Sequence, residues 1–206
     1  MKPEDIEKKS FNIIDKEAGL HHFSSDEWSI VRRMIHTSAD FEYKETVRFH
    51  LLAIKNGIKA IRSGKAIITD TEMAKVGIRK RDLINFGNEL ICFISDAEVI
   101  KQASQNSITR ASAAVDAALP YMEGGIYVVG NAPTALLRLI ELIKEKKAAP
   151  ALVVGFPVGF VNAAESKSQL TAMDYPFISN SGRKGGSNIA ASVINALIQL
   201  SVNSKQ

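Results

Sequence analysis

Short apolar runs alternate with longer segments that can form helices along the whole chain after Gly64. This alternation constrains the fold, because parallel strands need crossover connections of about a dozen residues or more, and these are usually helical. We therefore expect a three-layer α/β protein, in which a mainly parallel sheet of about five strands carries helices on both faces. The expected strands are Ala66–Thr69, Leu90–Ile94, Ile126–Gly130, Leu152–Gly155 and Phe177–Ser179.

The chain before Gly64 is predicted to be mainly helical and to precede the sheet. Ser24 and Glu27 have the spacing of a capping box, which predicts a helix over Ser25–His36. A second helix is predicted to end at Gly64, because the apolar residues before it recur at alternating spacings of four and three. These residues are Val47, Leu51, Ile54, Ile58 and Ile61.

Composition indicates one globular domain over residues 1–206. Of these residues, 46% are hydrophobic and 23% are charged, which suits a substantial core. The net charge is only +4 and there is no long basic run, so nucleic acid is not an expected partner. The single cysteine, Cys92, excludes an internal disulfide and a cysteine-based metal cluster.

No segment is expected to enter a membrane. The most apolar run, Ala148–Val161, is short and is interrupted by two prolines and two glycines. The residues at the start of the sequence are too polar for a secretory signal peptide. We therefore expect a cytoplasmic protein.

A glycine-rich loop within Ser181–Asn188 gives the strongest functional signal of the residues themselves. Three glycines surround two adjacent cations in it: Gly182, Arg183, Lys184, Gly185 and Gly186. A helix is expected to begin directly afterwards, so backbone N–H groups and cations would converge on an anion. The loop matches neither the P-loop pattern nor the dinucleotide-binding pattern, which favours carboxylates as ligands. A purely structural glycine turn is the alternative.

His36 is the candidate acid. An imidazole exchanges protons near neutral pH, and the C-terminal end of a helix favours its cationic form. A histidine that merely caps the last carbonyls of its helix is the commoner case, and the residues alone leave both interpretations open.

Other candidates are weaker when taken one by one. Arg110 lies in a segment of small residues and could hold a carboxylate through two parallel hydrogen bonds, or pair with Asp116. Asn131 follows an expected strand, where its loop would present free amides or form an ordinary turn into a helix. Lys167 would either pair with Glu165 or line the same pocket. Thr69 and Asp70 fit a simple helix cap.

The chain resembles the precorrin-8X methylmutase family over nearly its whole length. The segments that carry the resemblance are Arg33–Thr37, Gly130–Ala135, Leu152–Lys167 and Ser181–Asn188. The resemblance implies migration of a methyl group between adjacent carbons of ring C of a tetrapyrrole, which converts (cobalt-)precorrin-8 to hydrogenobyrinate or cobyrinate in cobalamin biosynthesis. It implies no consumed cofactor, no metal held by the protein, and a homodimer.

The resemblance also implies roles for particular residues. His36 would be the catalytic acid. The substrate would be bound by Ser10, Arg110, Asn131, Lys167, Arg183, Lys184 and Gly185. Two other functions stay open at this point: a corrinoid carrier that lacks catalysis, and an enzyme that binds phosphate or nucleotide through the glycine loop.

Overall fold

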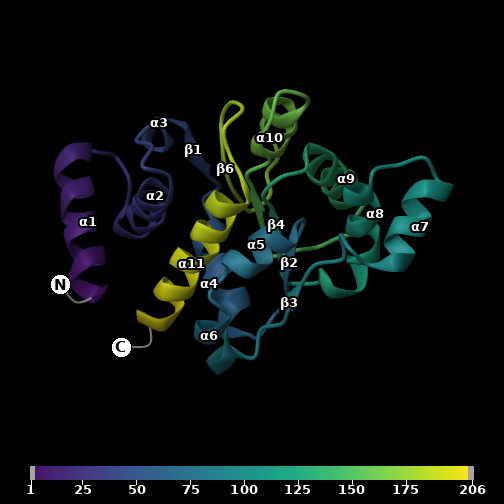
Figure 1. Ribbon diagram of the computed structural model, residues 1–206, viewed down its shortest axis with the longest axis horizontal. Coiled ribbons are helices and arrows are strands. Elements are labelled where there is room, and N and C mark those ends of the chain that lie inside the picture. Colours follow the sequence, from purple (N-terminus) through teal and green to yellow (C-terminus); the bar gives the residue numbers. More distant parts are fainter. Residues whose placement is uncertain (1–2, 204–206) are drawn as a thin grey trace.

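The computed structural model describes residues 3–203, and its centre is a six-stranded sheet with helices on both faces (Figure 1). The strand order is β1-β6-β5-β4-β2-β3, and every neighbouring pair is parallel except β1 with β6. The predicted α/β class is confirmed, and each expected strand segment contributes to the sheet. The strands are β1 (Val47–Phe49), β2 (Ile67–Thr69), β3 (Leu90–Ile91), β4 (Ile126–Val129), β5 (Leu152–Gly155) and β6 (Phe177–Asn180).

The central strands bury both of their faces, which explains why they appear in the sequence as continuous apolar runs. Successive side chains of a strand point to opposite faces. Val128, Val154 and Ile178 lie in one apolar core, whereas Val129 and Val153 lie in the other. Two separate cores thus sandwich the sheet.

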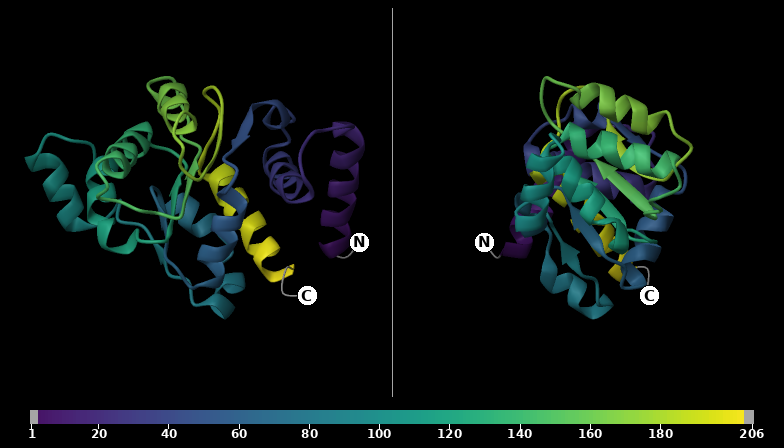
Figure 2. Two further views of the ribbon diagram at one scale, coloured as in Figure 1. Left: turned by 180° about the vertical axis from the view of Figure 1, so that it is seen from behind. Right: turned by 90° about the vertical axis from the view of Figure 1, so that its right-hand side faces the viewer.

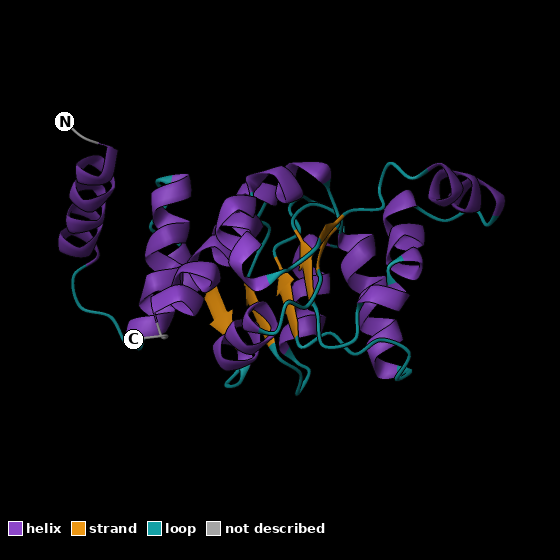
Figure 3. Ribbon diagram, turned by 90° about the horizontal axis from the view of Figure 1, so that it is seen from below, coloured by secondary structure: helices purple, strands orange, loops and turns teal. Residues whose placement is uncertain are grey.

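Each core is closed by its own layer of helices (Figure 2). The first layer contains α2 (Ser25–Ser38), α4 (Ala53–Arg62), α5 (Glu72–Gly77) and α11 (Ser187–Asn203). The second contains α8 (Arg110–Ala117), α9 (Pro133–Lys144) and α10 (Ala163–Thr171). Outside these layers, α1 (Pro3–Ala18) packs on α2 and α7 (Ala97–Gln105) packs on α8, and Figure 3 shows α1 at the periphery. Short helices complete the fold: α3 (Tyr43–Thr46), α6 (Lys80–Leu83) and the 3₁₀ turns Ile84–Phe86 and Leu119–Tyr121.

The helix predicted over Ser25–His36 is confirmed as α2. The Ser24 side chain accepts from the backbone of Glu27, while the Glu27 carboxylate accepts from the backbone N–H of Ser24 at 2.9 Å. This reciprocal pair satisfies N–H groups that have no partner within a helix. The helix ends at Ser38 and is followed by the capping residue Ala39, which has a left-handed conformation with φ 55°.

The second predicted helix was wrong in its first part. Val47 begins strand β1, which pairs antiparallel with β6, and the helix α4 starts only at Ala53. Leu51, which the periodicity placed on the buried face, is 93% exposed. The helical spacing of Val47 and Leu51 was coincidental, because β1 gains its backbone hydrogen bonds from the edge of the sheet. The sheet consequently has one strand more than expected.

Candidate active site at the carboxyl edge of the sheet

The loops that follow β4, β5 and β6 meet at one edge of the sheet and are tied together through their backbones. Val158 donates its N–H to the carbonyl of Asn131 at 3.4 Å. Gly159 donates to the carbonyl of Arg183 at 3.2 Å, and Gly186 donates to Phe156 at 2.9 Å. In sheets of this type, ligands bind beyond the carboxyl ends of the strands. A ligand is therefore expected to bind at this edge.

The loop after β4 is closed by the buried carboxylate of Asp70, which does more than the simple helix cap predicted from the sequence. Asp70, 1% exposed, accepts the backbone N–H groups of Gly130 at 2.8 Å, Asn131 at 2.9 Å and Ala132 at 2.8 Å. Burial raises the pKa of Asp70, and these hydrogen bonds oppose the rise. The prediction that this loop presents free amides was wrong, so only the exposed side chain of Asn131 is left to meet a ligand.

The glycine loop after β6 depends on glycine at three positions. Gly182 and Gly186 have φ values of 82° and 126°, which side chains disfavour. A Cβ atom on Gly185 would collide with the carbonyl oxygen of Phe156, so this position needs glycine for close approach of two backbones. The loop leads into α11, whose first residue, Ser187, shares a 2.8 Å hydroxyl hydrogen bond with Thr71.

Lys184 is not a free cation. Its ammonium lies 2.5 Å from a carboxylate oxygen of Asp40 and 2.7 Å from one of Glu42. The hydrogen bonds raise the pKa of Lys184 and lower that of Asp40. The side chain that was expected to bind substrate instead ties the glycine loop to the segment after α2.

Lys167 lies beneath the glycine loop and is completely buried in α10. Its ammonium donates to the side-chain oxygen of Asn180 at 3.1 Å and to the carbonyl of Lys184 at 2.5 Å. Burial lowers the pKa of Lys167 to about 8. Both sequence-based alternatives were wrong about its position, because Lys167 neither lines the surface nor pairs with Glu165, which is exposed.

Arg183 is the cation of this loop that faces outward. It is exposed, and its guanidinium carbon lies 5.5 Å from the ring centre of Phe160. Phe160 is itself 84% exposed, in the loop after β5. An arginine over an aromatic ring keeps its hydrogen-bond donors available at its edge. Arg183 can therefore receive a carboxylate from solvent.

Arg110 lies at the same edge, on the side of the second helix layer. It is the exposed first residue of α8, and the Thr109 hydroxyl before it donates to that of Thr134 in the first turn of α9 at 2.9 Å. The alternative pairing of Arg110 with Asp116 does not form, because Asp116 accepts from Arg138 at 2.8 Å. The start of α8, where Arg110 lies, is thus tied to the first turn of α9, which follows the Asn131 loop.

His36 lies on the other helix layer, exposed in the last turn of α2. Its ring meets the ring of Phe11 edge to face, with 5.2 Å between their centres. The guanidinium carbons of Arg32 and Arg33 lie 4.4 Å and 5.3 Å from the centre of the same phenylalanine ring. Phe11 therefore joins α1 to the histidine and to both arginines.

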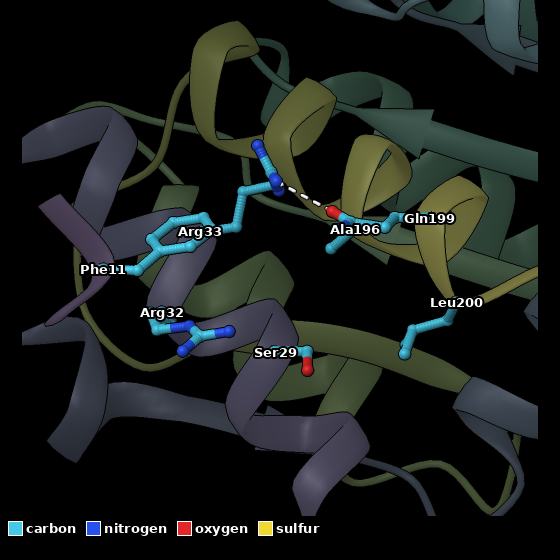
Figure 4. A pocket seen from close by; sticks show the side chains of 7 residues that line it. All are labelled: Phe11, Ser29, Arg32, Arg33, Ala196, Gln199 and Leu200. Carbon is cyan, nitrogen blue, oxygen red and sulfur yellow. Dashed lines mark hydrogen bonds between the residues drawn. The ribbon is translucent and has the colours of Figure 1, made fainter. Parts of the chain in front are cut away.

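A small cavity of about 130 Å³ lies beside this cluster and is lined by residues of α1, α2 and α11 (Figure 4). Arg33 crosses it to donate to Gln199 at 2.8 Å and also pairs with Glu7 at 3.1 Å, while Arg32 pairs with Asp15 at 2.8 Å. The two ion pairs fasten α1 to α2, and the hydrogen bond to Gln199 joins α2 to α11. Ser10, on α1, donates its hydroxyl to the carbonyl of Ile6 at 2.9 Å, so this serine currently bonds its own helix.

The site thus offers the exposed imidazole of His36 and several exposed donors for anions, among them Arg183 of the glycine loop. Over residues 3–203 no group of three or more His, Cys, Asp or Glu side chains is placed to hold a metal ion. Within the same residues, no helix has both the length and the apolar character needed to cross a membrane. The exposed imidazole and the exposed anion donors suit chemistry by proton donation and by positioning of a polyanionic molecule.

Comparison with known proteins identifies an isomerase of corrin biosynthesis as the class. The family model of the precorrin-8X methylmutases, CbiC, matches residues 5–200. The cobalt-precorrin-8 methylmutase of Priestia megaterium is 48% identical, with 96% of this chain and 88% of that protein covered. The Salmonella typhimurium protein of the same name is 44% identical, over 95% of this chain and 94% of that protein.

A solved structure agrees with these relatives. The precorrin-8X methylmutase of Thermus thermophilus superimposes with a TM-score of 0.92 at 46% identity, over 98% of this chain and 97% of that one. This chain belongs to the precorrin-8X methylmutase family, whose members are isomerases of cobalamin biosynthesis. The family resemblance predicted from the sequence is confirmed.

Proposed function

We propose that this protein, as a single methylmutase domain, converts (cobalt-)precorrin-8 to hydrogenobyrinate or cobyrinate. A methyl group leaves one carbon of ring C and bonds to the adjacent carbon, so substrate and product are isomers and no co-reactant is needed. The observation that carries the proposal is an exposed histidine and exposed anion-binding groups in a chain of this family. Any cobalt enters with the substrate.

His36 is the acid of the proposed reaction. A proton or strong hydrogen bond from its imidazole withdraws electron density from the conjugated ring while the methyl group moves. Its position at the end of α2 keeps one edge exposed while Phe11 packs against the ring. Phe11 therefore limits the orientations that the imidazole can adopt.

The peripheral acetate and propionate groups of the tetrapyrrole meet the other side of the site. Arg110 and Arg183 receive carboxylates, with the side chain of Asn131 and the N–H of Gly185 as neutral donors. Ser10 joins them if its hydroxyl turns away from the carbonyl of Ile6. Fixing several carboxylates at once holds ring C against the acid and converts binding energy into orientation.

The proposal includes a cytoplasmic homodimer. Large apolar side chains stand exposed on this subunit, among them Leu20 at 99%, Leu51 at 93% and Phe160 at 84%. A second copy would cover such surface, and a flat macrocycle is easily enclosed between two subunits. Light scattering during size-exclusion chromatography should give the mass of two chains, and a mass of one chain would contradict this part.

The decisive test mixes the protein with precorrin-8 in metal-free and cobalt forms and follows the visible absorption spectrum. The wild type should convert at least one form to the rearranged product. His36→Ala should lower turnover by about 10²- to 10⁴-fold, the range typical of a lost general acid, while binding changes little. His22→Ala removes an exposed histidine that lies outside the site and should leave turnover unchanged.

The possible outcomes separate the candidate functions. Binding without conversion in both forms would indicate a corrinoid carrier, and absence of binding would refute the proposed substrate. Turnover retained by His36→Ala would refute the role of His36 without refuting the reaction. The form that is converted assigns the protein to the cobalt-containing or the metal-free branch.

A further inference from the structure

Lys167 is a fully buried ammonium group that has only neutral partners. Its two acceptors are the amide oxygen of Asn180 and the carbonyl oxygen of Lys184, and within residues 3–203 no carboxylate pairs with it. Removing a charge from water is costly, and here no buried opposite charge compensates for it. The positive charge of Lys167 is therefore balanced only by the dipoles of these neutral groups, one of which belongs to the glycine loop.

The hydrogen bonds of Lys167 fix the orientation of one peptide group. The carbonyl oxygen of Lys184 accepts from Lys167 and, at 3.0 Å, also from the side-chain nitrogen of Asn180. No peptide bond of the described chain is cis, and in a planar trans peptide the N–H points opposite to the C=O. The N–H of Gly185 therefore points away from Lys167.

The neighbouring peptide groups hold this arrangement from the other side. Gly186 donates its N–H to the carbonyl of Phe156 at 2.9 Å, and Gly185 packs directly on the carbonyls of Phe156 and Pro157. The loop can therefore not rotate freely about the peptide that Lys167 holds. Gly185 is half-buried, so its N–H remains within reach of a ligand at the surface.

We propose that Lys167 is a positioning residue for substrate binding: it holds the Lys184 carbonyl inward, and the Gly185 N–H thereby faces a peripheral carboxylate of the tetrapyrrole. The inference rests on the proposed function and adds a dependence on pH. The protonated amine makes charge-assisted hydrogen bonds and attracts the anion through the loop, whereas the neutral amine does neither. The protein should therefore bind its substrate well only while Lys167 is protonated.

Among the charged groups near Lys167, we expect only Lys167 itself to change its protonation state between pH 7 and 9. The nearest cation of the loop, Lys184, turns its ammonium outward to Asp40 and Glu42, and its raised pKa keeps it charged. On β6, Asn180 has no charge. The charged side chains of α9 that form ion pairs, Arg138 and Glu141, bond to each other, and Arg138 also bonds to Asp116 of α8. On α10 itself, Glu165 is exposed.

The expected pH dependence follows from the pKa of about 8 that burial gives Lys167. The affinity for the tetrapyrrole should be highest well below pH 8 and should fall as the pH rises through 8. At pH 9 only about a tenth of the molecules are protonated, so the apparent affinity should be about tenfold weaker than at pH 7. Binding at pH 9 should take up about one proton per subunit, because the anion restores the charge of Lys167.

The first experiment uses the unaltered protein. Titration calorimetry with hydrogenobyrinate at pH 7, 8 and 9, in two buffers of different ionisation enthalpy, gives both affinity and proton uptake. A tenfold loss of affinity with proton uptake at pH 9 is the expected result. Equal affinity at pH 7 and 9 without proton uptake would overturn the inference, and this measurement requires no variant to fold.

Variants then assign the effect to Lys167. Lys167→Met should raise KM about tenfold at pH 7, leave kcat within about twofold, and remove the decline between pH 7 and 9. Lys167→Arg should keep binding at pH 9, because a guanidinium does not titrate there. Lys144→Met, at an exposed lysine of α9, should behave as the wild type. A decline that persists in Lys167→Met would overturn the assignment.

The two proposals fail in different ways. If the wild type neither binds hydrogenobyrinate nor converts precorrin-8 at pH 7, the proposed function is wrong. If it binds and converts, yet its affinity is independent of pH and of Lys167, the methylmutase function stands and the positioning role is wrong.

Discussion

Two loops at the carboxyl edge of the sheet are held from inside by buried charges of opposite sign. Behind the loop after β4 lies the carboxylate of Asp70, which accepts three consecutive backbone N–H groups. Behind the loop after β6 lies the ammonium of Lys167, which donates to the carbonyl of Lys184. Each charge is at most 1% exposed.

The sign of the buried charge decides what the loop has left for a ligand. A carboxylate consumes N–H donors, so the loop at Gly130–Ala132 cannot use its backbone to bind an anion. An ammonium consumes carbonyl acceptors and leaves donors such as the N–H of Gly185 unused by it. The two loops therefore differ in what they can bind, and only the loop after β6 leaves a backbone N–H for a carboxylate.

Asp70→Ala should have the largest effect on the fold. It leaves three N–H groups without their partner, and each unsatisfied buried group costs about 1–3 kcal/mol. We expect a loss of about 3–5 kcal/mol in the free energy of unfolding, measured by urea denaturation, out of the roughly 5–15 kcal/mol typical of a domain. Lys167→Met should cost less, because an apolar side chain of similar length replaces a lone buried charge.

A matched control keeps this interpretation open to contradiction. Asp174 has a fully exposed side chain that meets His50 at 3.1 Å. Asp174→Ala should change the free energy of unfolding by less than about 1 kcal/mol. If Asp70→Ala lowered the free energy of unfolding no more than this control, Asp70 would not hold the loop after β4. The proposed contrast between the two loops would then be wrong.

The sequence predicted those parts of the site that depend on neighbouring residues. The strand ends followed from apolar runs, and the start of a helix directly after the glycine loop followed from the residues of Ser181–Asn188. Contacts between distant residues had no such signal. Asp70 binds amides that lie 60 to 62 residues further on, and Lys184 pairs with a carboxylate 144 residues away.

The same limit explains the errors in the fold and in the interpretation of Lys167. Strand β1 forms because it pairs with β6, which is far away in the sequence. The residues around Val47 contain no signal for this pairing. Lys167 looked like a surface residue because lysine is almost never fully buried, and its burial depends on Asn180 and on the loop that folds over it. The sequence shows that Lys167 is a cation, but it does not show whether its side chain is buried or exposed.

Lys184 offers the smallest predicted effect and the sharpest test of which cation meets substrate. Its ammonium is already bound by Asp40 and Glu42, whereas the guanidinium of Arg183 faces solvent. Lys184→Met should therefore leave KM for the tetrapyrrole nearly unchanged, while Arg183→Met should raise it several-fold. Equal increases in the two variants would show that Lys184 exchanges its carboxylates for those of the substrate.

The ion pair of Lys184 should instead appear in the pH dependence of stability. The folded-state pKa of Asp40 is lowered, so the pair contributes stability above the ordinary pKa of aspartate, about 4, and this contribution is lost as pH falls through the lowered value. The raised pKa of Lys184 keeps the pair intact up to the normal pKa of lysine. The melting temperature of Lys184→Met should thus approach that of the wild type as pH falls through the lowered pKa of Asp40, and should lie slightly below it at pH 6 to 8. The difference should be small because the pair is exposed and screened.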